Sequence, residues 1–364
     1  MYDLHRAWID AGRRVLLFCI FLIAPLPAKP QEAKSGTLGQ PAKWAQTELQ
    51  STSFAWPASC NTASGIYLRQ LNGTQSWTYA PITQLLPNGN TRKIDLGAAT
   101  NFGESVLGVA FDSDGQGNVY AAIQIGRAIQ WYIAKYDNAG RFIRKLTLPG
   151  GLLPYFVLPI GGDRIVVGGV VSRASGTETH TKSVVAIFDK DGNQLNSLSL
   201  PDDDANEVVT KEPTKQMYYS VENPTIEGAK AVLADDGDIY ILRASDRPTL
   251  QVVAADGASQ RTVEFQPPAP DVMPSDLIVS KHSIAVAYFM SKSSKICLTK
   301  GALVVYGRQS GNVIATYYAQ LAPHRYVCAQ NHQLVYFRSE NGQTNYQIGR
   351  VDIPEPDSSP ILQK

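Results

Sequence analysis

The sequence predicts an all-β protein, a six-bladed β-propeller of four-stranded antiparallel blades, and two observations lead to this prediction. A module that reads as four short strands recurs along the chain, most clearly at 109–149. Apolar residues make up 44% of the chain, which is rich in Gly, Ser, Thr and Val and shows no long helical period. A repeated unit that cannot bury its own faces must stack on its neighbours, so the repeat indicates the architecture.

Two turns mark each module. The second turn is a glycine-containing hairpin turn of the kind that needs a positive φ, and it recurs at Gly89, Gly140, Gly192, Gly257 and Gly311. The separations are 51, 52, 65 and 54 residues, which is a period with one insertion. The strands that follow the first turn begin at Ile66, Val119, Ile165, Ile239, Ile284 and Leu334. These six strands predict six blades.

The last module stops after three strands, because only a tail rich in Pro, Asp and Ser follows Ile353. We expect the ring to be closed by an outer strand borrowed from the other terminus, within 47–54, because an open sheet edge is a liability. An unstructured leader up to Cys60 is the alternative. The chain then divides into a signal peptide at 1–28, a leader with the ring-closing strand at 29–56, a propeller at 57–354 and a flexible tail at 355–364.

The N-terminus has the pattern of a signal peptide. Arg6, Arg13 and Arg14 precede an apolar run at 15–24 that is too short for a bilayer, where about 20 residues are needed. Cleavage after Ala28 is our working assignment, although Leu26 departs from the small residue expected there. We therefore expect a secreted or periplasmic protein, with an uncleaved membrane anchor as the alternative.

Charge gives no reason to expect nucleic acid as a partner. The net charge is +1 and falls to about 0 without residues 1–28, and no block of five like charges occurs. After cleavage we expect no stable membrane span, a monomer, and a protein, peptide or glycan as partner.

Three cysteines remain after removal of the leader, an odd number in a compartment that permits disulfides. Cys297 lies in an extended loop of the fifth module and Cys328 on the inner strand of the sixth, so these two are the preferred pair. Pairings through Cys60 stay open, since Cys60 and Cys328 each precede their module's first turn by four residues. A zinc site would need a closer Cys/His set, and no C-x-x-C occurs.

The chain resembles six-bladed propellers of the NHL-repeat and TolB-like kind. The resemblance rests on the segments 108–112, 117–120, 134–137 and 140–145, and it spans roughly residues 60 to 353. It implies the architecture, and since such propellers include binding scaffolds, lactonases and other hydrolases, it leaves the function open.

In enzymes of this kind a metal or catalytic group sits at the mouth of the central channel, near the starts of the inner strands. The resemblance places six residues there: Glu104, Tyr155, Glu227, Asp276, His324 and Arg325. Three carboxylates and a histidine would suit a divalent cation or a general base. Solvated rim residues are the alternative interpretation, and we expect no other cofactor. The segment 112–118 is similar to the start of a calcium-binding loop, but the bidentate Glu expected at the twelfth position of such a loop is missing. We therefore interpret the segment as a hairpin turn.

No nucleophile elbow, Walker loop or metalloprotease spacing occurs. We interpret the insertion between Pro201 and Lys230 as a surface loop, and a lid over one face of the propeller is the alternative. Tyr155, Tyr218 and Tyr219 lie in predicted loops and are candidates for a recognition surface. The sequence thus favours an exported, non-enzymatic binding scaffold. A metal-assisted hydrolase or lactonase is the second hypothesis, and a structural envelope component is the third.

Overall fold

The structure is a computed structural model that divides into two units, Met1–Ala33 and Lys34–Lys364, and the described residues all belong to the second unit. They are 34–37, 58–61, 65–69, 81–86, 90–100, 104–126, 129–175, 178–198, 208–210, 230–243, 249–254, 260–268, 272–290, 302–318, 325–330, 333–340 and 343–347. The predicted signal peptide, the expected closing strand at 47–54 and the C-terminal tail lie outside them. No helix in these ranges is long and apolar enough to cross a membrane.

The described residues form strands in six sheets, with one short 3₁₀ helix, η3 (Leu96–Ala99). The first sheet contains β2 (Ala58–Asn61), β3 (Gly65–Arg69), β4 (Ile82–Leu85) and β5 (Thr91–Ile94). The second contains β6 (Val106–Ser113), β7 (Val119–Ile125), β8 (Trp131–Tyr136) and β9 (Phe142–Thr147). The third contains β10 (Leu152–Pro159), β11 (Ile165–Ser175), β12 (Glu178–Phe188) and β13 (Gln194–Leu198), and β14 (Val208–Thr210) also pairs with β12.

The fourth sheet contains β15 (Lys230–Leu233), β16 (Asp238–Arg243), β17 (Thr249–Ala254) and β18 (Gln260–Glu264). The fifth contains β19 (Val272–Val279), β20 (Ser283–Met290), β21 (Ala302–Gly307), β22 (Val313–Tyr318) and, beyond β22, β1 (Lys34–Thr37). The sixth contains β23 (Arg325–Gln330), β24 (Gln333–Glu340) and β25 (Gln343–Gln347). Within each sheet these strands follow chain order as an antiparallel meander, which is the blade of a β-propeller.

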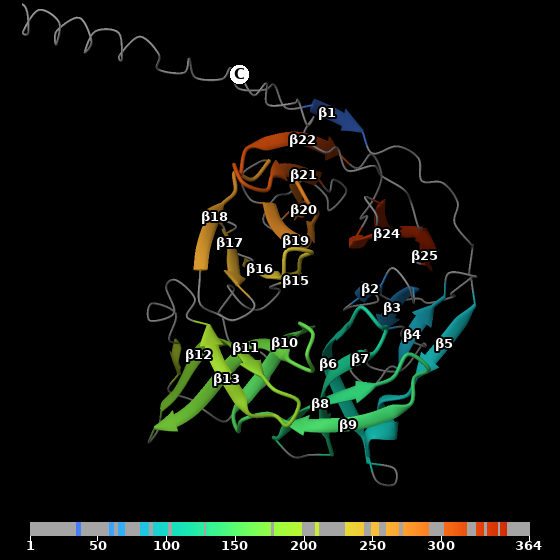
Figure 1. Ribbon diagram of the computed structural model, residues 1–364, viewed down its shortest axis with the longest axis vertical. Helices are drawn as coiled ribbons and strands as arrows, with labels where there is room; N and C mark the ends of the chain where they lie inside the picture. The colour runs from blue at the N-terminus through green and yellow to red at the C-terminus, as the bar shows by residue number, and fades with distance from the viewer. Residues whose placement is uncertain are drawn as a thin grey trace, which may run out of the picture. The chain divides into compact units, whose positions relative to one another are not determined.

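The first strand of each sheet lies beside the first strand of the next, and β23 also lies beside β2 (Figure 1). The sheets therefore follow one another around a shared centre that their inner strands β2, β6, β10, β15, β19 and β23 line. This arrangement confirms the predicted propeller of four-stranded antiparallel blades. It also places the start of each inner strand at the same end of the ring.

The number of four-stranded blades differs from the prediction. Five sheets have at least four strands and the β23–β25 sheet has three, so the described residues show five four-stranded blades and not the six that were predicted. The leader does contribute a strand, but β1 pairs with β22 at the outer edge of the fifth sheet (Figure 1). The closing strand expected within 47–54 lies outside the described residues and stays a prediction. The strand that the leader does contribute was not predicted, because the repeat does not indicate which exposed sheet edge takes an added strand.

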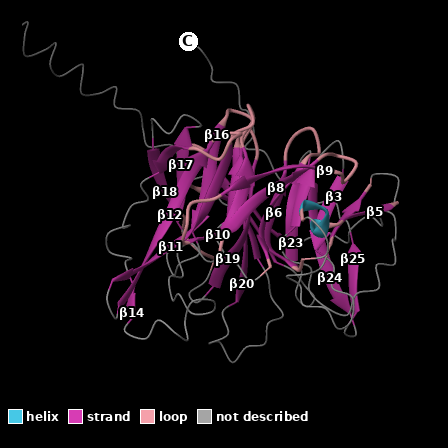
Figure 2. Ribbon diagram, turned by 90° about the horizontal axis from the view of Figure 1, so that it is seen from below, coloured by secondary structure: helices cyan, strands magenta, loops and turns pink. Residues whose placement is uncertain are grey.

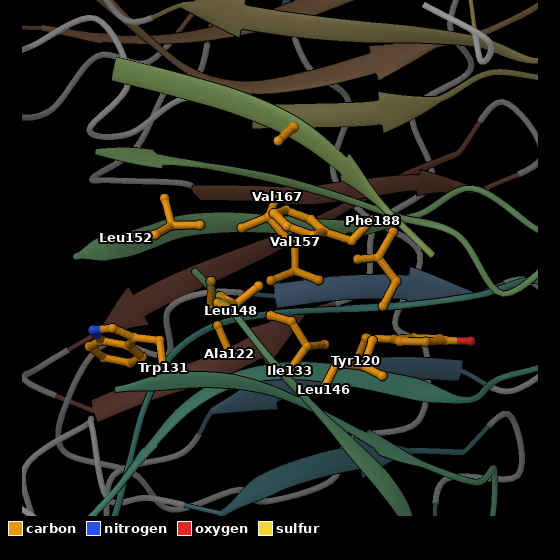
Figure 3. Packing of buried hydrophobic residues seen from close by; sticks show 13 residues of the cluster. Tyr120, Ala122, Trp131, Ile133, Leu146, Leu148, Leu152, Val157, Val167 and Phe188 are labelled. Atoms are coloured by element: carbon orange, nitrogen blue, oxygen red, sulfur yellow. The ribbon is translucent and has the colours of Figure 1, made fainter. Parts of the chain in front are cut away.

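The core lies in the seams between neighbouring sheets. Between the second and third sheets, Ala122, Ile133 and Leu146 pack against Val157 and Val167 (Figure 3). Similar clusters fill the seams between the first and second, third and fourth, and fourth and fifth sheets. Second strands such as β7 bury both faces, whereas outer strands such as β5 and β9 expose much of theirs. The stability of each sheet therefore depends on its neighbours in the ring.

In the second and fifth sheets, a tyrosine on the third strand is hydrogen-bonded to the segment that precedes the first strand of the same sheet. Tyr136 Oη of β8 donates to the Leu96 carbonyl at 3.0 Å, and Tyr306 Oη of β21 donates to the Gln266 carbonyl at 2.9 Å. Burial raises the pKa of both phenols, so both remain donors at neutral pH. These bonds fix the segments that lead into the inner strands β6 and β19.

An ion pair between the second and third sheets should stabilise the protein in a pH-dependent way. Asp163 accepts a hydrogen bond from Lys135 Nζ at 2.9 Å, and this bond holds the pKa of the Asp163 carboxyl below its usual 3.8. A lowered folded pKa adds stability above the ordinary pKa, and this stability is lost as pH falls through the folded value. Because Asp163 is 42% exposed, Asp163→Asn should cost only about 0.5 kcal/mol at pH 7.

Thermal melting between pH 2 and pH 7 checks this expectation. The wild-type and Asp163→Asn curves should separate at pH 7 and converge below pH 3.8. Asp235→Asn removes an exposed turn carboxylate and serves as the control. A gap between wild type and Asp163→Asn that stays constant with pH would contradict the assignment.

Candidate functional site

Four inner strands carry a bulge at the same register. The pairing with the second strand shifts between Gly108 and Ala110 in β6, Pro154 and Phe156 in β10, Pro274 and Asp276 in β19, and Tyr326 and Cys328 in β23. A bulge bends its strand and re-aims the neighbouring side chains, and bulges are common beside functional sites. The four bulges also provide a common reference for comparing positions along the channel.

The predicted channel-mouth residues lie at different depths. Glu104 is exposed and precedes Gly108 by four residues, whereas Asp276 follows Pro274 by two and is 5% exposed. Glu104 lies two residues before the start of β6, whereas Asp276 lies within β19 directly after its bulge. Tyr155 is the bulge residue of β10, half-buried against the core between the third and fourth sheets, and not in a loop as predicted, because the apolar run around it forms the inner strand. Glu104 is thus an exposed residue before β6 and Asp276 a buried residue of β19, and their shared role at a channel mouth stays a prediction.

The remaining predicted residues are only partly within the described chain. Glu227, His324 and Cys297 lie outside it, as do Tyr218 and Tyr219. Arg325 begins β23, and Cys328 occupies the same register position in β23 as Asp276 does in β19. Among the residues that the structure describes, no group of three or more His, Cys, Asp or Glu side chains is arranged to hold a metal ion.

A different set of polar side chains is buried on the fourth sheet. Ile241 and Val253 pack in the core that the third and fourth sheets share, so strand alternation places Arg243 and Gln251 on that same face. Arg243 is 4% exposed and Gln251 is 3% exposed. Ile241 pairs with Gln251 across the sheet and Arg243 pairs with Thr249, which makes Arg243 and Gln251 diagonal neighbours.

The third sheet turns hydroxyl groups toward the same seam. Val170 and Val185 belong to the shared core, so alternation along β11 and β12 directs Ser172, Thr181 and Ser183 to the fourth sheet. Ser172 Oγ lies 3.2 Å from Thr181 Oγ1, and Thr181 and Ser183 are buried. We call Ser172, Thr181, Ser183, Arg243 and Gln251 the seam patch. Both halves lie toward the end of the seam at which the inner strands begin.

Gln251 is the distinctive member of the seam patch. Its Nε2 and Oε1 atoms are both buried, and neither has a hydrogen-bond partner among the residues described. A buried amide with no partner costs about 1–3 kcal/mol for each group left unpaired, and native proteins rarely keep one without a reason. Gln251 thus offers an NH₂ donor group and an acceptor oxygen on the face of the fourth sheet that it shares with Arg243.

The insertion predicted between Pro201 and Lys230 returns to this part of the third sheet. Its strand β14 pairs antiparallel with β12, with Thr210 opposite Thr179 and Val208 opposite Thr181 (Figure 2). Thr181 is therefore a member of the seam patch and also the point where the insertion joins the sheet. The rest of the insertion lies outside the described residues.

The sequence analysis did not select the seam patch. The available signal was a polar residue inside an otherwise apolar run, as at Gln251 between Leu250 and Val252. Alternation alone would have put Gln251 on one face, but it does not indicate which sheet that face meets. The pairing of the third and fourth sheets supplies that information.

No protein family and no curated protein matches the sequence. Several solved structures align with the chain at low identity. A protein of unknown function from Dyadobacter fermentans is 9% identical, with a TM-score of 0.49 over 85% of this chain and 96% of that one. One from Bacteroides caccae is 10% identical, with a TM-score of 0.43 over 75% and 88%.

A GH74 xyloglucanase from Xanthomonas campestris is 14% identical, with a TM-score of 0.48 over 85% of this chain. The matched region is 46% of the xyloglucanase, so this chain spans about half of that enzyme. Identities in this range do not bring a function from these proteins to this chain. The class of protein is therefore the β-propeller that the sheets define, and its function has to be argued from its own residues.

Proposed function

We propose that the protein is an exported binding scaffold, secreted or periplasmic, that holds a glycan or peptide at the seam patch. The observation that carries the proposal is the buried amide of Gln251, whose donor and acceptor have no partner among the described residues. A sugar with adjacent hydroxyl groups, or a peptide group, offers a donor and an acceptor side by side and would pair both atoms. The hydroxyls of Ser172, Thr181 and Ser183 would add contacts of the same kind.

Two further features support the scaffold. Loops held by a rigid sheet carry function more often than the strands do, and the insertion meets the sheet beside Thr181. Tyr155 lies half-buried against the same shared core, and tyrosines supply large contact areas at recognition surfaces. Ligand binding at this seam would also join the third sheet to the fourth, which links recognition to the stability of the ring.

A thermal-shift screen of the mature protein tests the proposal. Neutral oligosaccharides and short peptides are the ligands, and a bound ligand at a hundred times its dissociation constant should add about 2.7 kcal/mol of stability. A positive hit should protect the β16–β17 amides from hydrogen exchange. Hits that leave those amides unchanged, or no hit in either ligand class, would contradict the proposal.

Replacing Gln251 separates a binding role from a structural one. Gln251→Leu nearly keeps the side-chain volume and removes the unpaired donor and acceptor. The free energy of unfolding of the unliganded protein should therefore stay the same or rise by up to about 1 kcal/mol. The ligand-induced shift should disappear. Thr83→Val, which removes another buried hydroxyl without a described partner, in the first sheet, is the matched control and should keep the shift. A ligand shift that survives Gln251→Leu would contradict the assignment.

A metal-assisted hydrolase or lactonase is the second candidate, and the buried carboxylate of Asp276 on the inner strand β19 favours it. The same thermal-shift screen therefore includes calcium, magnesium, manganese and zinc, with and without chelator. A metal-specific rise that Asp276→Asn abolishes would support the hydrolase, and lactones and esters would be assayed next. Glu104→Ala removes an exposed carboxylate before β6 and shows whether Glu104 shares the metal with Asp276.

A further inference from the structure

The outer edge of the fifth sheet holds a strand that does not belong to the repeat. β1 pairs with β22 in parallel, Lys34 with Ala315 through Thr37 with Tyr318. Within the described part of the chain it is the one parallel pair, because each blade is an antiparallel meander. β1 is therefore not part of the repeated module, and it pairs with the free edge of the outer strand β22 (Figure 1).

The two strands of this pair are unequal in β-forming character. β22 has the sequence Val-Ile-Ala-Thr-Tyr-Tyr, which is β-branched and aromatic, whereas β1 has Lys-Ser-Gly-Thr, of which three residues are poor strand formers. Gly36 lies opposite Tyr317 and brings no side chain to the pair. The ladder is only four residues long. A strong acceptor edge is thus occupied by a weak strand.

The acceptor edge itself is firmly held. β22 pairs with β21 from Val313 to Tyr318, and Ala315 is fully buried in the core of the fifth sheet, against which Tyr317 also packs. A rigid edge strand presents a row of backbone N–H and C=O groups to whatever strand lies alongside it. Recognition by strand addition uses this row for affinity and alternate side chains for specificity.

We propose that the β22 edge is a docking site for an extended segment of a partner protein, which adds parallel to β22 in the place of β1. The preferred segment has β-branched or aromatic residues where β1 has Lys34, Ser35 and Gly36. β1 shows the direction and register of such a segment and acts as the tethered competitor, with an effective concentration set by the tether. The site lies on the outer edge of the fifth sheet and goes beyond the seam patch proposed above.

Two full-length variants should change the competition between β1 and an added peptide for the β22 edge in opposite directions. Ser35→Pro with Thr37→Pro removes two backbone donors and should release β1, whereas Gly36→Val should strengthen its pairing. The probe is a fluorescent peptide of residues 30–41 that carries Gly36→Val. Fluorescence anisotropy should show at least tenfold tighter probe binding to the proline variant than to wild type, and weaker binding to the Gly36→Val chain. Equal binding to all three proteins, or no binding to a proline variant that melts like wild type, overturns the proposal.

Hydrogen exchange of the wild-type protein keeps the proposal testable if the proline variant does not fold. Excess probe should expose the amides of Lys34–Thr37 while those of Ala315–Tyr318 stay protected, and no change would overturn the proposal. A Ser35→Cys, Thr316→Cys protein tests whether the strand beside β22 comes from the same chain or from a second copy. An intrachain disulfide agrees with the proposal, whereas disulfide-linked dimers would mean that a second copy supplies the strand, which also overturns it.

Discussion

Replacing Gly169 with alanine should destabilise the protein by about 3 kcal/mol or more, because the third sheet has no room for a methyl group at this position. A Cβ built on Gly169 would lie 2.1 Å from the Leu153 carbonyl oxygen and 2.9 Å from Pro154 Cα. Both neighbours are backbone atoms of β10 beside the Tyr155 bulge, so β10 and β11 would have to separate. The midpoint of urea unfolding should fall accordingly.

Two other glycines provide the comparisons. Gly115 lies exposed in the turn between β6 and β7 with nothing within 4 Å of a built Cβ, so Gly115→Ala should change stability little. A Cβ on Gly168 would meet the Phe156 ring, which is a side chain. Phe156→Leu should therefore relieve Gly168→Ala in a double variant, whereas it should not relieve Gly169→Ala. A mild Gly169→Ala protein would mean that the two strands are paired differently.

The second large effect is expected at Arg308, which joins the fourth and fifth sheets. Its guanidinium donates to Tyr240 Oη at 2.8 Å and to the Asp236 carboxylate, and it lies over the Tyr240 ring. It also donates to the Ser280 carbonyl at 3.2 Å. Arg308 is 9% exposed, so Arg308→Ala removes a set of largely buried hydrogen bonds between the two sheets and should cost about 3 kcal/mol in the free energy of unfolding.

Charge alone does not account for this contact. Arg308→Lys keeps the positive charge but loses the planar fork, so it should recover only part of the lost stability. Arg141→Ala removes an ion pair to Asp137 with a similarly short distance of 2.7 Å, but the Arg141 side chain is 82% exposed. The loss of stability should therefore be small, because both charges are screened by solvent. Chemical denaturation of the three variants distinguishes the cases, and equal losses for Arg308→Ala and Arg141→Ala would contradict the account.

Local chemistry in the sequence was sufficient to predict the turns and the repeat. Gly140 and Gly192 have φ of 81° and 87°, as expected for the second turn of a module. Asp114 accepts from the backbone amides of Gln116 and Asn118, which is the predicted hairpin turn. The described part of the last module has three strands, as predicted. These features depend on neighbouring residues, so one stretch of sequence contains the information.

The failures have a common cause in long-range pairing. The leader strand β1 meets β22 across more than 270 residues, and nothing in Lys34–Thr37 alone indicates that edge. The seam patch joins Thr181 to a sheet whose Gln251 is 70 residues away. The channel-mouth set stays a prediction, because Glu227 and His324 lie outside the described residues and the order of residues along one strand does not indicate which side chains of different sheets meet.

The most direct measurement of the central claim is titration calorimetry of the strongest thermal-shift ligand against wild type, Gln251→Leu and Thr83→Val. The account predicts that wild type and Thr83→Val bind alike, while Gln251→Leu, although folded and at least as stable, loses tenfold or more in affinity because two buried hydrogen bonds are absent. Equal affinity for all three proteins would contradict a binding site at the seam between the third and fourth sheets.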